Sequence, residues 1–266
     1  MIVRWTDDGW KEKEWLLDAL NLSKDDEPRV VSLVGAGGKT TVVLRLREEC
    51  LGAGISHVVT TTTHMQLERS GDFLSEASLE RVTEMAGRFG TVWLGEPVSE
   101  EKMKGFPVDF LEQVYAKGLW LFVEADGAKR MLVKAPEEHE PVVVPFSTDV
   151  LAVYGLDAVG RPIGEVCFRV DKVTALLGKT PADILTAVDI VRLAASASGG
   201  RKQVTDGMYY SVILNKADTL ERIAVAEEIA GGLRAAGIET ILATADLMPE
   251  RTKKNGGISL MKCEIQ

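Results

Sequence analysis

Cysteine, histidine and long apolar runs are scarce in this sequence, and each shortage excludes a class of protein. The three cysteines, Cys50, Cys167 and Cys263, lie far apart and form no C-x-x-C pair, so neither a disulfide framework nor a cysteine-based zinc site is expected. Nothing at helical spacing suggests a metal-binding pair of histidine and glutamate. No apolar run approaches the roughly 18 residues of a membrane-spanning helix, and the first residues contain no apolar signal core. We therefore expect a soluble protein of the reducing cytoplasm that binds no membrane.

Positive charge is also in short supply. The chain has 31 Lys and Arg against 40 Asp and Glu, which gives a formal net charge of -9. A chain of this charge is a poor candidate for binding nucleic acid or anionic lipid. Apolar side chains, in contrast, make up 45% of the 266 residues. That content is enough for one large α/β domain, or two small ones, to fold without disulfides.

The most informative segment spans residues 30–44. An apolar, β-branched run is followed by a glycine-rich turn, and the apolar pattern resumes with helical spacing after a lysine and two threonines. This order, strand, glycine-rich loop and helix, is typical of a phosphate-binding loop. Glycines allow successive N–H groups to face one anion, and the first turn of the helix adds its unpaired N–H groups. The predicted nucleotide-binding residues are Gly35, Ala36, Gly37, Gly38, Lys39, Thr40 and Thr41.

The loop departs from the G-x-x-x-x-G-K-[ST] pattern at one position. Leu33 stands where the pattern has its first glycine, and Gly35 opens the loop instead. We interpret this as a shifted variant, in which Lys39 lies between the β- and γ-phosphates and the Thr40 hydroxyl binds Mg²⁺. An ordinary glycine-rich turn that carries a lysine by chance is the alternative.

The rest of the chain alternates strand and helix patterns. This alternation predicts an α/β protein with a three-layer, P-loop NTPase-like fold, in which a mostly parallel sheet has helices on both faces. We expect an N-terminal helical appendage over residues 1–28, with its helix at residues 10–21. The nucleotide-binding domain is expected over residues 29–250, with a mainly helical insertion at about 160–205, and a polar tail over residues 251–266.

A second motif, Asn215-Lys216-Ala217-Asp218, follows an apolar strand. The Asp218 carboxylate can accept two hydrogen bonds from the N1–H and 2-amino groups of guanine, and adenine offers no such pattern. Asn215 and the stem of Lys216 would support the base. The motif therefore predicts a preference for GTP, whereas the structural alternative is that Asp218 only caps the next helix.

A third element is the acidic end of the apolar strand at residues 119–123. Glu124 and Asp126 follow it directly, which is where P-loop folds hold the magnesium shell or polarise an attacking water. The sequence leaves open which carboxylate serves the metal. Together with Lys39, these two acids are the candidate catalytic residues, and Thr40, Glu124 and Asp126 are the candidate magnesium ligands.

Other polar residues at predicted strand ends and loops form a weaker group of candidates. A substrate or switch role is expected for Thr62, Thr63, His64, Lys134 and His139. Each has a simpler explanation, because a histidine or lysine in a polar loop is more often solvated than catalytic.

Several short segments together resemble one family. They are residues 34–41, 61–65, 124–128, 134–136 with 139–141, 155–157 and 214–218. In combination they look like the YqeC-type accessory proteins of selenium-dependent molybdenum hydroxylases. The resemblance implies a bacterial cytoplasmic protein that takes part in the maturation of such a hydroxylase, and the hydroxylase or its cofactor-assembly proteins as partners. It implies no set of catalytic residues.

The sequence thus predicts a Mg²⁺-dependent GTPase that gates or drives an assembly step, with in-line attack of water on the γ-phosphate. No arginine that would stabilise the transition state from within the chain is evident. Two alternatives stay open. A small-molecule kinase would pass the γ-phosphate of ATP or GTP to an acceptor, and a nucleotide-gated chaperone would bind nucleotide without hydrolysis.

Overall fold

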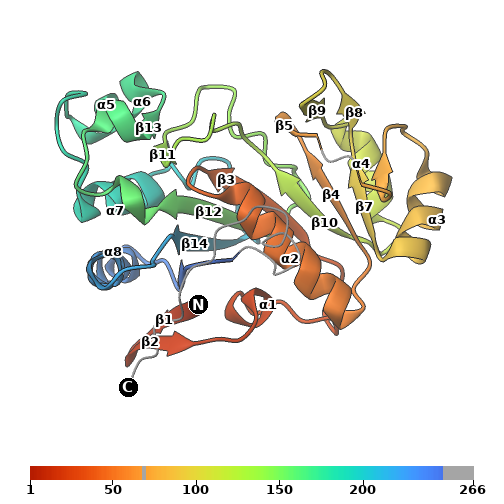
Figure 1. Cartoon of the computed structure of the whole chain (residues 1–266), viewed down its shortest axis with the longest axis horizontal. Helices are drawn as coiled ribbons and strands as arrows, with labels where there is room; N and C mark the ends of the chain where they lie inside the picture. Colours follow the sequence, from red (N-terminus) through yellow and green to blue (C-terminus); the bar gives the residue numbers. More distant parts are fainter. Residues whose placement is uncertain (68–69, 248–266) are drawn as a thin grey trace, which may run out of the picture.

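The fold is organised around one large sheet. A computed structural model describes residues 1–67 and 70–247 of the chain. Within them a ten-stranded sheet has the order β2-β1-β15-β14-β12-β3-β10-β4-β7-β6 (Figure 1). The strands in that order are Gly9–Glu12, Ile2–Thr6, Thr240–Thr244, Tyr209–Asn215, Asp149–Gly155, Val30–Gly35, Trp120–Glu124, His57–Thr61, Thr91–Leu94 and Phe73–Leu74. All pairs from β15 to β6 are parallel, whereas β1 and β2 are antiparallel additions.

Helices cover both faces of the sheet. The longer ones are α2 (Lys39–Ala53), α3 (Leu79–Phe89), α4 (Val108–Tyr115), α6 (Val170–Leu177), α7 (Ala187–Ala195) and α8 (Leu220–Ala235), and the short ones are α1 (Leu16–Ala19), η1 (Leu156–Ala158) and α5 (Ile163–Val166). Alternate residues along the strands separate the two sides. On β3, Val31 and Leu33 pack in the cluster that holds α1 and α2. Val30 and Val34 face the opposite side, toward the clusters of α3 with α4 and of α7 with α8. The predicted three-layer α/β fold is confirmed.

Strand β3 lies in the middle of the sheet, and its apolar sequence allows both of its faces to be covered. Its six residues are all buried between β12 and β10, as expected for a strand covered on both sides of a parallel sheet. Its one polar side chain, Ser32, shares a 2.7 Å hydrogen bond with Ser147. The loop after this strand therefore starts from a rigid base in the middle of the sheet.

Two small sheets lie beyond the carboxyl edge of the large one. One contains β5 (His64–Gln66), β9 (Lys102–Lys104) and β8 (Glu96–Pro97), and the other pairs β11 (Val133–Lys134) with β13 (Cys167–Phe168). Figure 1 shows them on either side of the point where β3 leads into α2. They form two walls around the start of that helix.

The structure corrects the prediction for the N-terminus. The helix expected at residues 10–21 is wrong, because β1 and β2 form a hairpin that extends the large sheet through β15. Trp5 and Trp10 are opposite each other in this hairpin, with ring centroids 4.9 Å apart, a cross-strand contact that favours strands over a helix. Only the short α1 follows, and its Leu16 and Leu17 N–H groups each donate a 2.9 Å hydrogen bond to the buried carboxylate of Glu49 on α2.

Residues 160–205, the expected helical insertion, contain α5, α6 and α7. The expected tail at residues 251–266 lies outside the described residues. No helix in the described part of the chain is both long and apolar enough to cross a membrane.

Candidate functional site

The loop between β3 and α2 is held tightly by its neighbours before any ligand is considered. The N–H of Gly35 donates to the Asp126 carboxylate at 3.0 Å, and the N–H of Ala36 donates to the Val153 carbonyl at 3.0 Å. The N–H of Gly37 donates to the Met131 carbonyl, also at 3.0 Å. These three amides, which the sequence predicts as phosphate donors, bind the protein instead.

Gly37 and Gly38, like Gly35 before them, leave no space for a side chain. A Cβ on Gly37 would lie 2.2 Å from the backbone nitrogen of Gly155, and φ is +86° there. A Cβ on Gly38 would lie 2.2 Å from the Asn215 amide nitrogen, with φ at +129°. Only glycine meets both the left-handed backbone and the close approach. The loop therefore packs closely against the residues around it, and it is shorter than a loop of the G-x-x-x-x-G-K-[ST] pattern.

The first turn of α2 supplies the unpaired amides. Helix α2 begins at Lys39 after Gly38, and no side chain caps it. Among the described residues, no backbone carbonyl or side chain accepts a hydrogen bond from the N–H groups of Gly38, Lys39, Thr40 or Thr41. Four unpaired N–H groups and the positive end of the helix dipole make this an anion-binding position.

Lys39, the first residue of α2, is buried between the carboxylates of Asp126 and Glu124. Its Nζ lies 2.9 Å from Asp126 and 3.7 Å from Glu124, and it donates a 2.6 Å hydrogen bond to the Gly35 carbonyl. Burial alone would lower the pKa of Lys39, but Asp126 and Glu124 reverse the effect, so the pKa is raised. Lys39 is a stable cation at the base of the site.

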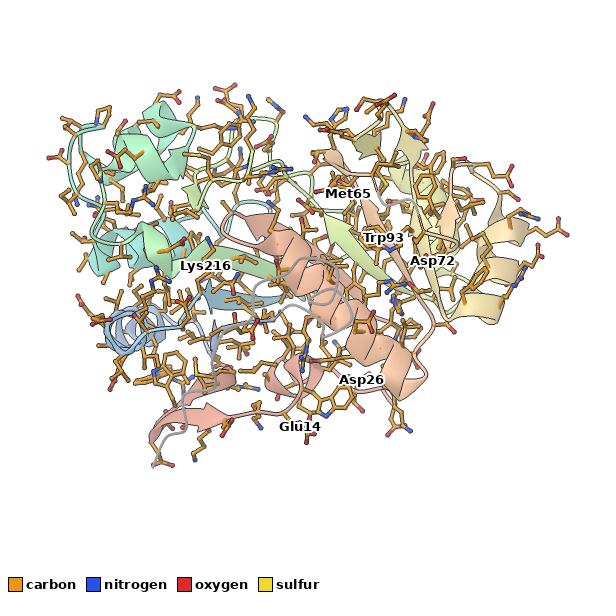
Figure 2. All side chains as sticks on the ribbon, viewed as in Figure 1. Glu14, Asp26, Met65, Asp72, Trp93 and Lys216 are labelled. Atoms are coloured by element: carbon orange, nitrogen blue, oxygen red, sulfur yellow. The ribbon has the colours of Figure 1, made fainter. Side chains whose placement is uncertain are left out.

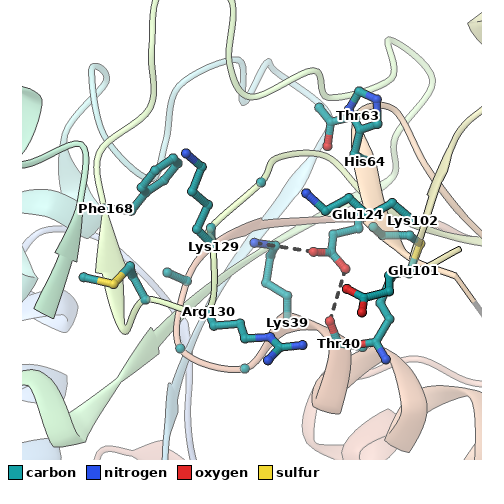
Figure 3. A pocket seen from close by; sticks show the side chains of 18 of the residues that line it. Lys39, Thr40, Thr63, His64, Glu101, Lys102, Glu124, Lys129, Arg130 and Phe168 are labelled. Carbon is teal, nitrogen blue, oxygen red and sulfur yellow. Dashed lines mark hydrogen bonds and ion pairs between the residues drawn. The ribbon is translucent and has the colours of Figure 1, made fainter. Parts of the chain in front are cut away.

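Glu124 and Asp126 have different positions. Glu124 faces the cavity described below, and the Thr40 hydroxyl donates to its Oε2 at 3.4 Å (Figure 3). Burial raises the pKa of Glu124, and Lys39 and the Thr40 hydroxyl oppose the shift. Asp126 is 1% exposed, and its oxygens contact the Gly35 N–H, Lys39 and Lys134. Of these two acids, Glu124 lines the cavity together with Thr40, and Asp126 does not.

Thr40 and Glu124 are the side chains that could hold a magnesium ion at this position. Within residues 1–67 and 70–247, no three His, Cys, Asp or Glu side chains are grouped as a metal site. One hydroxyl and one carboxylate, Thr40 and Glu124, are what a P-loop protein supplies, since phosphates and water complete the shell of Mg²⁺. The residues present fit an ion that enters together with a nucleotide.

A cavity of about 1290 Å³ opens over the start of α2. Figure 2 places Lys216 and Met65, both of which line it, on either side of that helix end. The lining consists of residues 36–40, residues 63–66 with 98–102, Glu124 with residues 127–132, and Glu140, Phe168, Arg169 and Lys216. Typical single-ligand pockets measure about 300–1,000 Å³, so the cavity has room for more than one ligand.

The Asn215–Asp218 motif lies at the end of β14, beside the loop. The Asn215 amide donates to the Gly37 carbonyl at 2.9 Å and accepts from the Thr244 hydroxyl at 3.0 Å. Asn215 therefore supports the loop. The Asp218 side chain is 56% exposed and paired with Arg222, and it is not part of the cavity lining.

The sequence model of the YqeC protein family matches residues 31–171, more than half of the chain. The chain belongs to the YqeC protein family. A relative named "Uncharacterized protein YqeC", from Escherichia coli (strain K12), is 27% identical over 228 residues, which cover 84% of this chain and 89% of the relative. The predicted family is thereby confirmed.

The YqeC match includes most of the site. The loop, Glu124, Asp126 and both small sheets lie within residues 31–171. The Asn215–Asp218 motif lies beyond the end of the match. The family match therefore bears on the start of α2 and its acidic neighbours, and not on Asn215–Asp218.

The expected substrate or switch residues are divided among three environments in this YqeC protein. Thr63 and His64 line the cavity. The Thr62 hydroxyl donates to the Val142 carbonyl at 2.7 Å, away from the cavity lining. Lys134 is buried, and His139 is exposed outside the lining.

Sequence reasoning missed the partners of Lys134. Its Nζ lies 3.1 Å from Asp126 and 2.7 Å from Glu140, and it donates to the Gly127 carbonyl at 2.7 Å. Arg169 continues the contacts, at 2.6 Å from Glu140 and 3.0 Å from Glu137. We name this set the charged row, which alternates in sign and runs in the order Glu124, Lys39, Asp126, Lys134, Glu140, Arg169, Glu137, Lys172. No single motif in the sequence marks it, because its members come from four separate stretches of the chain.

Proposed function

We propose that this YqeC protein is a Mg²⁺-dependent nucleoside triphosphatase that prefers GTP. The observation that carries the proposal is the convergence at the start of α2: four N–H groups without a partner among the described residues, a buried Lys39, and Thr40 beside Glu124. Helix N-termini of this kind bind phosphate. The proposed role in the maturation of a selenium-dependent molybdenum hydroxylase rests on the family resemblance of its sequence motifs.

Each residue of the site has a defined part in the proposed reaction. The N–H groups of residues 38–41 and the Lys39 ammonium bind the oxygens of the β- and γ-phosphates. Thr40 and Glu124 hold the magnesium ion, which neutralises phosphate charge when bound. Asp126 fixes Lys39 and the Gly35 N–H, so it keeps the loop in position. Water attacks the γ-phosphorus, the bond to the β-phosphate oxygen breaks, and the products are GDP, phosphate and a proton.

The preference for guanine rests on Asp218. Its carboxylate is exposed at the end of β14, next to the segment of β15 that ends in Thr244. Asn215 and Lys216, which precede it, contact the loop and the cavity respectively. A base bound beyond the phosphates on this side would meet Asp218 after the carboxylate leaves Arg222.

The test is a titration of the purified protein with GTP and ATP in the presence of Mg²⁺, with release of phosphate followed in parallel. Lys39→Ala is expected to weaken binding of both nucleotides by about 100-fold, because a charged contact to the phosphates is lost. Asp218→Ala is expected to remove the preference for GTP. Asp7→Ala is the matched control, since Asp7 is also an exposed acid that is paired with an arginine.

The outcomes separate the parts of the proposal. If the wild-type protein binds neither nucleotide, the proposal is wrong. If ATP binds as well as GTP and Asp218→Ala changes nothing, the preference for guanine is wrong and Asn215–Asp218 is a structural turn.

A small-molecule kinase is the second candidate, favoured by the size of the cavity. The lining continues past the phosphate position to Thr63, His64, Lys102 and Phe168, which leaves space for an acceptor. A kinase would bind nucleotide tightly but release little phosphate to water, so the same phosphate assay distinguishes it from the triphosphatase.

A further inference from the structure

Three of the six cations that line the cavity have an acidic partner among the described residues. Lys39 is paired with Asp126 and Glu124, and Lys216 lies 2.7 Å from Asp157. Arg169 belongs to the charged row. Among the described residues, Lys102, Lys129 and Arg130 line the cavity without an ion pair or a side-chain hydrogen bond. Beyond Lys39, a further cation for a transferred phosphoryl group can therefore come from within this group of unpaired side chains.

Arg130 is held next to the phosphate-binding loop by the backbone on its C-terminal side. The carbonyl of Met131 accepts the Gly37 N–H at 3.0 Å, and the carbonyl of Leu132 accepts the Gly155 N–H at 3.0 Å. The Met131 N–H closes a turn to the Ala128 carbonyl at 2.9 Å. Arg130 is thus one residue away from a direct hydrogen bond to the loop.

The turn directs Lys129 and Arg130 differently. Both have left-handed backbone conformations, with φ of 45° and 61°, which residues with a Cβ rarely adopt. The Lys129 ammonium lies 5.4 Å from the centre of the Phe168 ring. Figure 3 shows Lys129 extended toward Phe168 and Arg130 pointing into the cavity toward the start of α2. Arg130 is thus the cation of this turn that faces the phosphate position.

We propose that Arg130 is a catalytic residue, an arginine supplied within the chain that contacts the γ-phosphate in the transition state. This inference rests on the proposed function. The planar guanidinium donates two hydrogen bonds to oxygens of the transferred phosphoryl group. As the bond between the γ-phosphorus and the β-phosphate oxygen breaks and water attacks, negative charge shifts toward the leaving oxygen, and the guanidinium stabilises it. The missing arginine of the sequence-based prediction is thus in the loop after β10.

The test measures turnover and binding separately in wild type, Arg130→Ala, Arg130→Lys and Lys129→Ala. Single-turnover hydrolysis of GTP with Mg²⁺ gives the rate, and titration with GDP gives the affinity and also verifies folding. Arginines in this role contribute about 10³-fold or more, so Arg130→Ala is expected to lower the rate by about 1,000-fold with GDP affinity within about threefold of wild type. Arg130→Lys should stay well below wild type because it lacks the two-pronged geometry.

A transition-state mimic adds a measurement that a structural role would not change. GDP with aluminium fluoride is expected to assemble on wild type and on Lys129→Ala, and to fail on Arg130→Ala. Lys129→Ala is the matched control because it removes the neighbouring cation of the same turn.

Two results would overturn the inference while the proposed function stands. One is a rate for Arg130→Ala within threefold of wild type, and the other is an equal loss in Lys129→Ala, which would indicate a general charge effect. A wild-type protein that binds GTP without hydrolysis refutes the triphosphatase and the catalytic role of Arg130 together.

Discussion

Replacement of Lys134 by methionine tests whether the charged row stabilises the fold. The Lys134 side chain is 1% exposed and lies between Asp126 and Glu140, at 3.1 and 2.7 Å. Removal of one member of a buried ion pair typically costs about 3–5 kcal/mol, because the partner charge stays buried. In the variant, Asp126 still has its ion pair with Lys39, and Glu140 still has its ion pair with Arg169. We therefore expect a loss at the lower end of this range, about 3 kcal/mol.

The assay is thermal and urea unfolding of Lys134→Met next to wild type. For a chain of this size, about 3 kcal/mol corresponds to a fall in melting temperature of roughly 6–12 °C. Lys216→Met is the control, because its ion pair with Asp157 is also 2.7 Å long but the two side chains are 36% and 21% exposed. It should lose less than about 1 kcal/mol. Equal losses in the two variants, or a loss below about 1 kcal/mol in Lys134→Met, would refute the reasoning.

Two further predictions concern pH and backbone packing. Burial lowers the pKa of His57 from 6.5 to about 4, so between these values the unfolded chain binds more protons than the folded one. Stability is then full above pH 6.5 and falls as the pH drops, by about 2 kcal/mol from pH 7 to pH 5, and His57→Gln should remove this part of the slope in urea titrations. Gly37→Ala is expected to cost about 3 kcal/mol, since a strained φ is joined by a clash with Gly155. Gly54→Ala, with φ of +73° and no atom within 4 Å of the added Cβ, should cost about 1 kcal/mol in the same unfolding assay. Equal costs at the two glycines would contradict the packing argument.

The core of the fold was predictable because its signals are local. The continuous apolar pattern of β3 and the glycine that ends α2, Gly54, are each signals carried by a few neighbouring residues. The N-terminal hairpin was not predictable in this way. Trp5 and Trp10 make their contact across strands, and β1 depends on pairing with β15 at the other end of the chain. Apolar residues at mixed spacing fit both a helix and a hairpin, and tertiary pairing decided the outcome.

The part of the candidate site that lies at the ends of parallel strands was predictable from the sequence. Lys39, Thr40 and Glu124 lie together, as expected of neighbouring parallel strands. The hydrogen bond from the Gly37 N–H to the Met131 carbonyl was not predictable, because it depends on the path of a loop almost 100 residues away in the sequence. Arg130 was hidden for the same reason, since no sequence pattern determines where a turn with left-handed backbone directs its side chains.

The charged row also constrains how this protein can change in evolution. Its four carboxylates and four cations cancel, and each interior member contacts a neighbour of opposite charge on both sides. A neutral substitution at a buried member such as Asp126 or Lys134 leaves an unbalanced buried charge, whereas loss of an adjacent pair keeps the sum at zero. Mutations along the row are therefore expected to be accepted two at a time. Because the row joins Lys39 to Lys172 on α6, the helical insertion and the loop between β3 and α2 would diverge together.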